Sequence, residues 1–128
     1  MNYGRFAAAI NCMDGRIQLP VIKYLQENYG VKYVDIITEP GPIKYLEKET
    51  SDAVVETIKE RLQISVEKHG SKIVAISGHH DCAGNPVDKE KQIKQIHGSV
   101  KTVESWGYNV KIIKLWINEK WEIEDLDS

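Results

Sequence analysis

The sequence predicts an α/β fold in which helices flank a central, mostly parallel sheet of four β-strands. Short apolar runs alternate with longer segments in which apolar residues recur every three or four positions, the spacing of one helix face. The apolar runs do not alternate cleanly between polar and apolar residues, which is typical of strands buried on both faces. The 128 residues also suit one compact domain, so residues 1–128 are expected to form a single domain.

The first strand is expected over residues 5–11, where an apolar run follows a turn containing glycine. A helix should come next, because Pro20 suits a first helical turn and Gly30 a C-terminal stop. The second apolar run then predicts a strand over residues 32–38. A helix between two strands forms a βαβ unit, which favours a parallel pair.

The second predicted helix has the clearest pattern. Residues 50–52, Thr-Ser-Asp, are candidate N-caps, and apolar residues recur at four-residue steps from Val54 until Gly70. The third strand is expected over residues 72–77. A third helix should begin with Asn85 as its cap and Pro86 in its first turn.

That third helix should end at Gly107, and the fourth strand is expected over residues 109–117. Residues 118–128 carry five acidic side chains against one lysine, which is typical of a solvated edge or tail. Trp116 and Trp121 leave two alternatives open for this segment. The tryptophans pack on a partner chain, or the tail folds onto its own domain.

Composition excludes several classes of function. Seventeen basic and nineteen acidic side chains give a net charge of −2, so we expect no nucleic-acid partner. The apolar runs are far shorter than the roughly 20 residues of a membrane helix, so no membrane association is expected. The N-terminal segment has one cation and a five-residue apolar stretch, too short for a secretory signal, which favours the cytoplasm.

Two loops follow strands at the edge of the sheet where α/β proteins bind ligands. Residues 12–16 read Cys-Met-Asp-Gly-Arg, and residues 78–85 read Gly-His-His-Asp-Cys-Ala-Gly-Asn. Two cysteines cannot form a disulfide scaffold, and such a pair in a reducing compartment is more often metal-binding or reactive. Cys12, Cys82 and one histidine of the second loop would give zinc three ligands and an open fourth position. This pattern indicates metal-assisted hydration or hydrolysis.

The neighbouring polar residues leave alternatives open. Asp14 would occupy the fourth metal position or accept a hydrogen bond from metal-bound water, and Arg16 would hold it in a bidentate pair. The simpler alternative makes Asp14 a turn residue and Arg16 a surface cation. His80 would replace His79 as the ligand, carry protons in the pocket, or lie in solvent.

Cys-x-Asp-x-Arg after the first strand, together with Gly-His-x-x-Cys after the third, resembles the zinc signature of the β-class carbonic anhydrases. The resemblance implies a β-carbonic-anhydrase-like fold with one Zn²⁺ per chain on Cys12, His79 and Cys82. It implies a catalytic pair formed by Asp14 and Arg16. The implied activity is the reversible hydration of carbon dioxide to bicarbonate by a zinc-bound hydroxide, in a homodimer or higher homo-oligomer.

The chain departs from the family pattern in several places. Residues 39–42 read Glu-Pro-Gly-Pro where the family usually has Arg-Asn-Ala-Gly-Asn, so that turn's contacts cannot be carried over. Gly15 and Ala83 replace a common serine and a common glycine. The first predicted strand begins near Met1, whereas most members have N-terminal helices that wrap a partner subunit.

These departures keep other functions open beside carbon dioxide hydration. One is hydrolysis of a related linear substrate, carbon disulfide or carbonyl sulfide. Another is a zinc-binding relative without turnover, whose altered loops serve binding or regulation. A redox pair of Cys12 and Cys82 would explain the cysteines but would leave His79, Asp14 and Arg16 without a role.

Overall fold

A computed structural model describes residues 2–48 and 52–127 of the chain. The elements occur in the order β1 (Phe6–Cys12), α1 (Gly15–Tyr29), β2 (Tyr33–Glu39), α2 (Pro42–Leu46), α3 (Ala53–His69), β3 (Ile73–His79), α4 (Lys89–Ser105), β4 (Lys111–Ile117) and β5 (Ile123–Asp125). The four strands expected from the apolar runs are therefore present, close to their predicted bounds.

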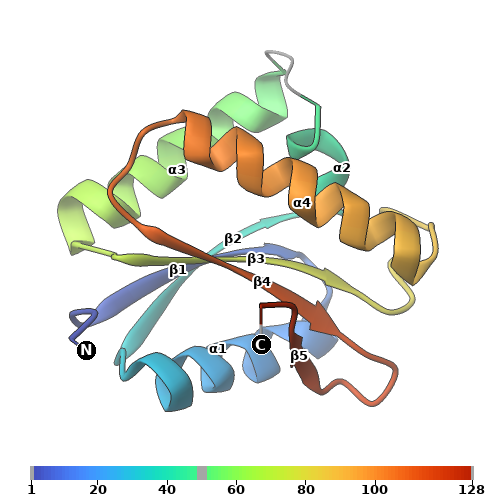
Figure 1. Cartoon of the computed structure of the whole chain (residues 1–128), viewed down its shortest axis with the longest axis horizontal. Helices are drawn as coiled ribbons and strands as arrows, with labels where there is room; N and C mark the ends of the chain where they lie inside the picture. Colours follow the sequence, from blue (N-terminus) through green and yellow to red (C-terminus); the bar gives the residue numbers. More distant parts are fainter. Residues whose placement is uncertain (1, 49–51, 128) are drawn as a thin grey trace.

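The strands form one sheet in the order β2-β1-β3-β4-β5. The first four run parallel, and β5 pairs antiparallel with β4. Helix α1 covers one face of the sheet, while α2, α3 and α4 cover the other (Figure 1). The predicted α/β class is confirmed, with a fifth strand added in the segment expected to be an edge or tail.

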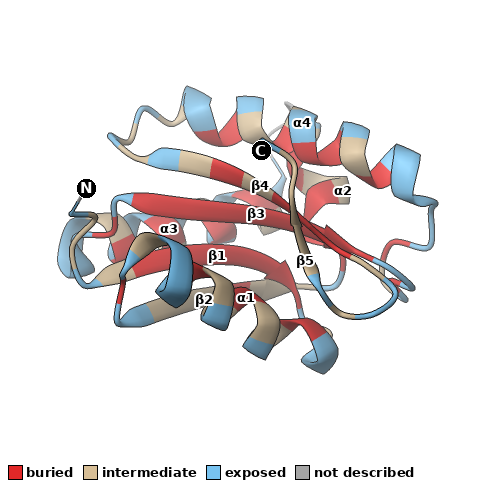
Figure 2. Cartoon of the chain, turned by 60° about the horizontal axis from the view of Figure 1, so that its bottom comes forward, coloured by how far each residue is buried: buried red, intermediate tan, exposed pale blue. Residues whose placement is uncertain are grey.

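Both faces of the sheet are buried. The central strands β1 and β3 are buried along nearly their whole length (Figure 2), which explains the missing alternation in their sequences. On the α1 face, the core includes Ile17, Val21 and Leu25. On the other face it includes Ile58 and Ile96 from α3 and α4. Packing against helices on both faces therefore fixes the carboxyl ends of β1 and β3.

Two helices begin elsewhere than predicted. Helix α1 starts at Gly15, because the Asp14 carboxylate accepts a hydrogen bond from the Arg16 backbone N–H at 2.9 Å. Pro20 lies inside this helix rather than in its first turn. The N-cap of α4 is Asp88, whose carboxylate accepts from the Lys91 N–H at 2.8 Å.

Asn85 was expected to cap the third helix, and this prediction is wrong. Its side chain is buried and donates instead to Oε1 of Gln95 at 2.7 Å. The N-cap of α3 is Asp52, which accepts from the Val54 N–H at 2.7 Å. The other two cap candidates, Thr50 and Ser51, lie outside the described residues.

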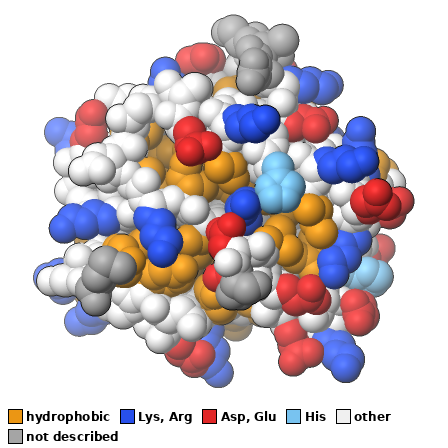
Figure 3. Space-filling view, viewed as in Figure 1, with side chains coloured by type: hydrophobic (Ala, Val, Ile, Leu, Met, Phe, Trp, Pro, Cys, Tyr) orange, Lys and Arg blue, Asp and Glu red, His pale blue; other side chains and the backbone are white. Residues whose placement is uncertain are grey.

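The surface mixes charges of both signs. Basic and acidic side chains are intermixed over the face shown in Figure 3, and the net charge of the chain is −2. Trp116 is 3% exposed within its own chain.

Over residues 2–48 and 52–127, no helix combines the length and apolar character that spanning a membrane requires.

Candidate metal centre

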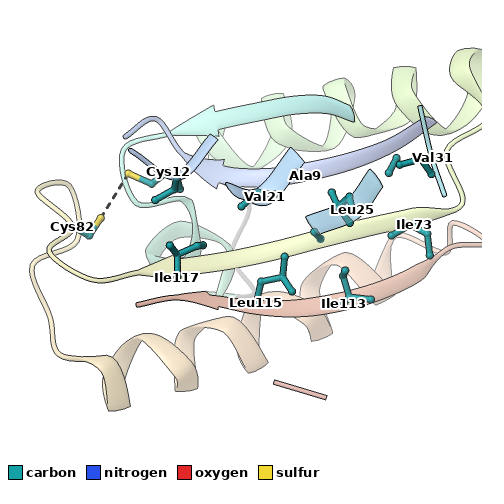
Figure 4. Close-up of a cluster of buried hydrophobic side chains, with 13 residues drawn as sticks. Ala9, Cys12, Val21, Leu25, Val31, Ile73, Cys82, Ile113, Leu115 and Ile117 are labelled. Carbon is teal, nitrogen blue, oxygen red and sulfur yellow. Dashed lines mark hydrogen bonds between the residues drawn. The ribbon is translucent and has the colours of Figure 1, made fainter. Parts of the chain in front are cut away.

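The three predicted ligands meet at one edge of the sheet. Cys12 is the last residue of β1, and His79 is the last residue of the adjacent strand β3. Cys82 lies in the loop after β3 and faces Cys12 (Figure 4). Parallel strands end at the same edge, so two segments distant in sequence converge there.

The cluster has the dimensions of a metal site. The Sγ atoms of Cys12 and Cys82 lie 3.7 Å apart, and one ligand atom from each of Cys12, His79 and Cys82 lies within 4.8 Å of the others. Two sulfurs bound at about 2.3 Å to a tetrahedral ion would be about 3.8 Å apart, whereas a disulfide would need about 2.05 Å. Both thiols are free and only 6% exposed. The residues therefore fit a zinc ion.

The orientation of His79 supports the same conclusion. Its Nδ1 lies 2.7 Å from the backbone carbonyl of His80, so Nδ1 carries the proton and Nε2 keeps a lone pair. Among buried side-chain nitrogen and oxygen atoms of the described residues, this Nε2 alone has no hydrogen-bond partner. An unpaired buried polar atom is costly, and a metal ion would satisfy it.

The cluster favours one thiolate even without a metal. A hydrogen bond from Cys82 lowers the pKa of Cys12, and the neighbouring Cys12 in turn raises the pKa of Cys82. Burial lowers the pKa of His79, but the Cys12 sulfur and the His80 carbonyl outweigh it and raise that pKa overall. A divalent cation would replace the shared proton of the thiols.

His80, whose role the sequence left open, lies outside this cluster. Its side chain is exposed, and its ring packs edge-on against Trp121 with centroids 6.3 Å apart. A surface cavity of about 340 Å³ adjoins the same loop and is lined in part by His80, Asp81 and Gln92.

Sequence reasoning missed Gln92, which fixes the backbone of His79. Gln92 Oε1 accepts from the His79 N–H at 3.1 Å, and Gln92 Nε2 donates to the His79 carbonyl at 2.9 Å. A Cβ at Gly78 would lie 2.7 Å from that Oε1, so a larger residue there would displace the Gln92 amide from His79. The available signal was a glutamine four residues before Ile96, on the buried helix face.

The loop after β1 is braced by a second set of polar side chains. Gln18 Nε2 donates to the carbonyls of Cys12 and Asp14, each at 2.8 Å. Gln18 Oε1 accepts from Asn11 at 3.1 Å, and Asn11 accepts from Ser77 at 2.9 Å. This chain of hydrogen bonds links the ends of β1 and β3 beneath the cluster.

The turn at residues 39–42, which departs from the family pattern, packs against the loop of Cys82. A Cβ at Gly84 would lie 2.7 Å from the carbonyl carbon of Pro40, so the two backbones are in close contact. Gly41 has a left-handed φ of 68°, and its backbone N–H helps to lower the pKa of Cys12. The turn therefore supports both cysteine loops.

Asp14 and Arg16 form the bidentate pair expected from the sequence. Arg16 Nη2 donates to Asp14 Oδ2 at 2.7 Å, and Arg16 Nε donates to Oδ1 at 3.1 Å. The guanidinium lowers the pKa of Asp14 from 3.8 to about 2, so the carboxylate is ionised at neutral pH. The pair lies beside the cluster, because Asp14 follows Cys12 by two residues and Arg16 Nη2 donates to the carbonyl of Asp81, the neighbour of Cys82, at 3.1 Å.

Comparison with known proteins agrees with this fold. A family model described as Putative carbonic anhydrase matches residues 2–127. A search of curated proteins found no match.

Two solved structures share the fold. One is a tetrameric β-carbonic anhydrase from Sordaria macrospora, with 12% sequence identity and a TM-score of 0.55, covering 100% of this chain and 83% of that chain. The other is the β-carbonic anhydrase CafA from Aspergillus fumigatus, with 14% identity and a TM-score of 0.50, covering 98% of this chain and 76% of that chain. At these identities the likeness shows the fold alone.

Proposed function

The chain belongs to the family described as Putative carbonic anhydrase, and on that premise we propose that it catalyses the reversible hydration of carbon dioxide to bicarbonate. One observation carries the proposal. Two thiols and the His79 imidazole offer ligand atoms within 4.8 Å of one another, and the Nε2 of that imidazole has no hydrogen-bond partner. Beside them lies a carboxylate that an arginine holds at 2.7 Å. A soft-metal site next to an ionised hydrogen-bond acceptor suits the activation of water.

The proposed ligands of one Zn²⁺ per chain are Cys12, His79 and Cys82. Two thiolates and a neutral imidazole would balance the 2+ charge, and three protein ligands leave the open position of a catalytic site. Bound zinc would lower the pKa of a water ligand toward about 7. The proposal treats residues 1–128 as a single zinc-binding domain.

The side chains around the site would orient the reactants. The His80 carbonyl holds the proton on Nδ1 of His79, which leaves Nε2 available as a ligand. Asp14 would accept a hydrogen bond from the nucleophilic water and orient it toward carbon dioxide. Arg16 occupies both carboxylate oxygens and so would keep Asp14 from becoming a fourth ligand.

The test is to measure zinc content and carbon dioxide hydration on one zinc-loaded sample of the full chain. One zinc per chain with hydration supports the proposal. Zinc without hydration would instead support a zinc-binding protein, and an added assay with carbonyl sulfide or carbon disulfide would detect the related hydrolase. A chain that takes up no metal and forms a Cys12–Cys82 disulfide would favour the redox pair.

The proposal extends to assembly and location. A homodimer or higher homo-oligomer would cover the metal edge of the sheet, and sedimentation at micromolar concentration tests this. A monomer under those conditions would contradict it. The cytoplasm is the proposed location, because its reducing conditions keep both thiols free to bind metal.

A further inference from the structure

Two residues with a left-handed backbone contact the same arginine. Among the described non-glycine residues, only Asp81 and Trp121 have a positive φ, at 57° and 60°. A left-handed backbone is unfavourable for a residue as bulky as tryptophan. Such strain persists only where the surrounding structure imposes it, and it concentrates at functional sites. Asp81 follows β3 and Trp121 precedes β5, yet both lie against Arg16.

The contacts surround the Arg16 guanidinium. Nη1 lies 3.3 Å from Oδ2 of Asp81, and Nη2 donates to the Asp81 backbone carbonyl at 3.1 Å. The Trp121 ring covers the face of the guanidinium, with its centroid 4.2 Å from Cζ. The same guanidinium binds Asp14 through Nε and Nη2. Its edges therefore contact two aspartates while its face contacts an indole.

The Trp121 ring is positioned by its own turn. The Trp121 N–H donates to the Asn118 carbonyl at 2.9 Å. Asn118 Oδ1 accepts from the N–H groups of Lys120 and Glu122 at 2.9 and 3.1 Å. The flanking strands pair Ile117 with Ile123. None of these hydrogen bonds involves Arg16, so the turn itself positions the Trp121 backbone.

We propose that Trp121 and Asp81 are positioning residues that hold the Arg16 side chain on Asp14. The Arg16 side chain is 44% exposed, so without these contacts it would sample other rotamers. Asp14, released from Arg16 and only two residues from Cys12, would then compete for the open metal position. The inference rests on the proposed function, because it assumes that the Asp14–Arg16 pair serves a metal site.

The first test needs no metal. In the metal-free full chain, the ¹⁵N–¹H heteronuclear NOE of the Arg16 Nε–H group reports how rigid the side chain is. Trp121→Gly removes the ring but tolerates the left-handed backbone, and Asp81→Asn removes the charge from a position where asparagine tolerates it. Trp106→Leu is the control, because Trp106 lies at the far end of α4.

We expect a rigid Nε–H group in the wild type and in Trp106→Leu. Trp121→Gly and Asp81→Asn should each lower the NOE. A mobile Arg16 in the wild type, or an unchanged NOE in Trp121→Gly, would overturn the proposal. The signal is assigned by its loss in Arg16→Ala.

The second test measures azide binding to the cobalt(II)-substituted chain by its visible spectrum. An Asp14 carboxylate that competes for the metal should weaken azide binding. Trp121→Gly should lower azide affinity about two- to fivefold, the factor expected for an exposed cation–π contact. Trp121→Phe should restore part of it, and Trp106→Leu should match the wild type.

Equal azide affinity in Trp121→Gly and the wild type would overturn the proposal. Failure of the proposed function can be told apart from failure of this inference. A zinc-loaded wild type that does not hydrate carbon dioxide would refute catalysis. Both tests above would still decide the role of Trp121 and Asp81. A chain that binds no cobalt would refute the metal site, and the NOE would then decide the positioning role alone.

Discussion

Two histidines in this chain each have Nδ1 close to an oxygen atom, but they differ in their burial and in their surroundings. His79 Nδ1 lies 2.7 Å from a backbone carbonyl, and His69 Nδ1 lies 2.7 Å from the Asp35 carboxylate. His79 is 1% exposed with an unpartnered Nε2, whereas the His69 side chain is 41% exposed and stacks on Phe6. A histidine that is buried with a free lone pair needs a ligand, and an exposed one does not.

The groups around each histidine show the same difference. Near His69, the Ser65 hydroxyl donates to Asp35 at 2.7 Å and lies 2.7 Å from the Ser71 hydroxyl. These groups satisfy one another and join the end of α3 to β2. Near His79, two free thiols lie 3.7 Å apart, and one ligand atom from each of the two cysteines and the histidine lies within 4.8 Å of the others. We infer that the His69 cluster stabilises the fold and the His79 cluster binds metal.

The largest expected effect comes from removing a sulfur ligand. Cys82→Ser should lower zinc affinity more than about 100-fold, because losing even a hydrogen-bond partner of a ligand costs about 10- to 100-fold. Zinc per chain, measured by mass spectrometry after dialysis, checks this. The control is His69→Gln, which should keep one zinc per chain. Full zinc occupancy in Cys82→Ser would refute the ligand assignment.

The next effect separates catalysis from metal binding. Arg16→Ala should keep zinc but lower the hydration rate about 100-fold or more, because Asp14 is freed to move toward the metal. Asp14→Ala should lose activity to a similar extent, since no acceptor remains to orient the water. Stopped-flow hydration assays on zinc-loaded variants measure both. Wild-type rates in Arg16→Ala would show that Arg16 is not needed to keep Asp14 away from the metal.

A smaller effect is expected from Gln92, which touches only the backbone of the ligand. Gln92→Leu leaves the buried N–H and carbonyl of His79 without partners. It should lower the free energy of unfolding by about 2 kcal/mol and zinc affinity about 10-fold. Denaturant titration and zinc competition measure these changes. Gln63→Leu, at an exposed position, serves as a control. An equal effect in both variants would show that the Gln92 hydrogen bonds do not support the backbone of His79.

The smallest expected effect is on acid stability. Arg16 lowers the pKa of Asp14 from 3.8 to about 2, so its stabilisation is complete above about pH 4 and is lost as the pH falls through 2. In metal-free chain, Asp14→Asn keeps a good N-cap but removes the charge. Between pH 4 and pH 2, the free energy of unfolding of the wild type should fall by about 1 kcal/mol more than that of Asp14→Asn. Identical pH profiles would contradict the pairing.

Much of the fold was predictable because burial leaves a pattern in the sequence. The strands β1 and β3 are continuous apolar runs, and α3 repeats apolar residues along one face. The short strand β5 could not be predicted, because its three residues include two acidic side chains and pair only at the edge of the sheet. Helix α2, with five residues, has too few for a periodic pattern.

The candidate ligands were predictable in part for a similar reason, because Cys12 and one histidine with Cys82 lie where two buried strands end at one edge. The choice of His79 over His80 came from the resemblance to the β-class carbonic anhydrases. Their supports were not predictable. Gln92 lies on the buried face of α4, but its partner is a backbone that this spacing does not identify. Trp121 reaches Arg16 only through a left-handed turn, which leaves no spacing pattern in the sequence. Asparagine commonly caps helices, but the buried hydrogen bond of Asn85 to Gln95 overrides that local preference.

The central inference is that the edge of the sheet carrying His79 binds zinc through two sulfurs and one imidazole. Zinc K-edge X-ray absorption on the zinc-loaded full chain tests it most directly. We predict two sulfur neighbours at about 2.3 Å, with imidazole nitrogen and one further light atom at about 2.0 to 2.1 Å. A zinc shell without sulfur, made only of nitrogen and oxygen, would contradict the assignment.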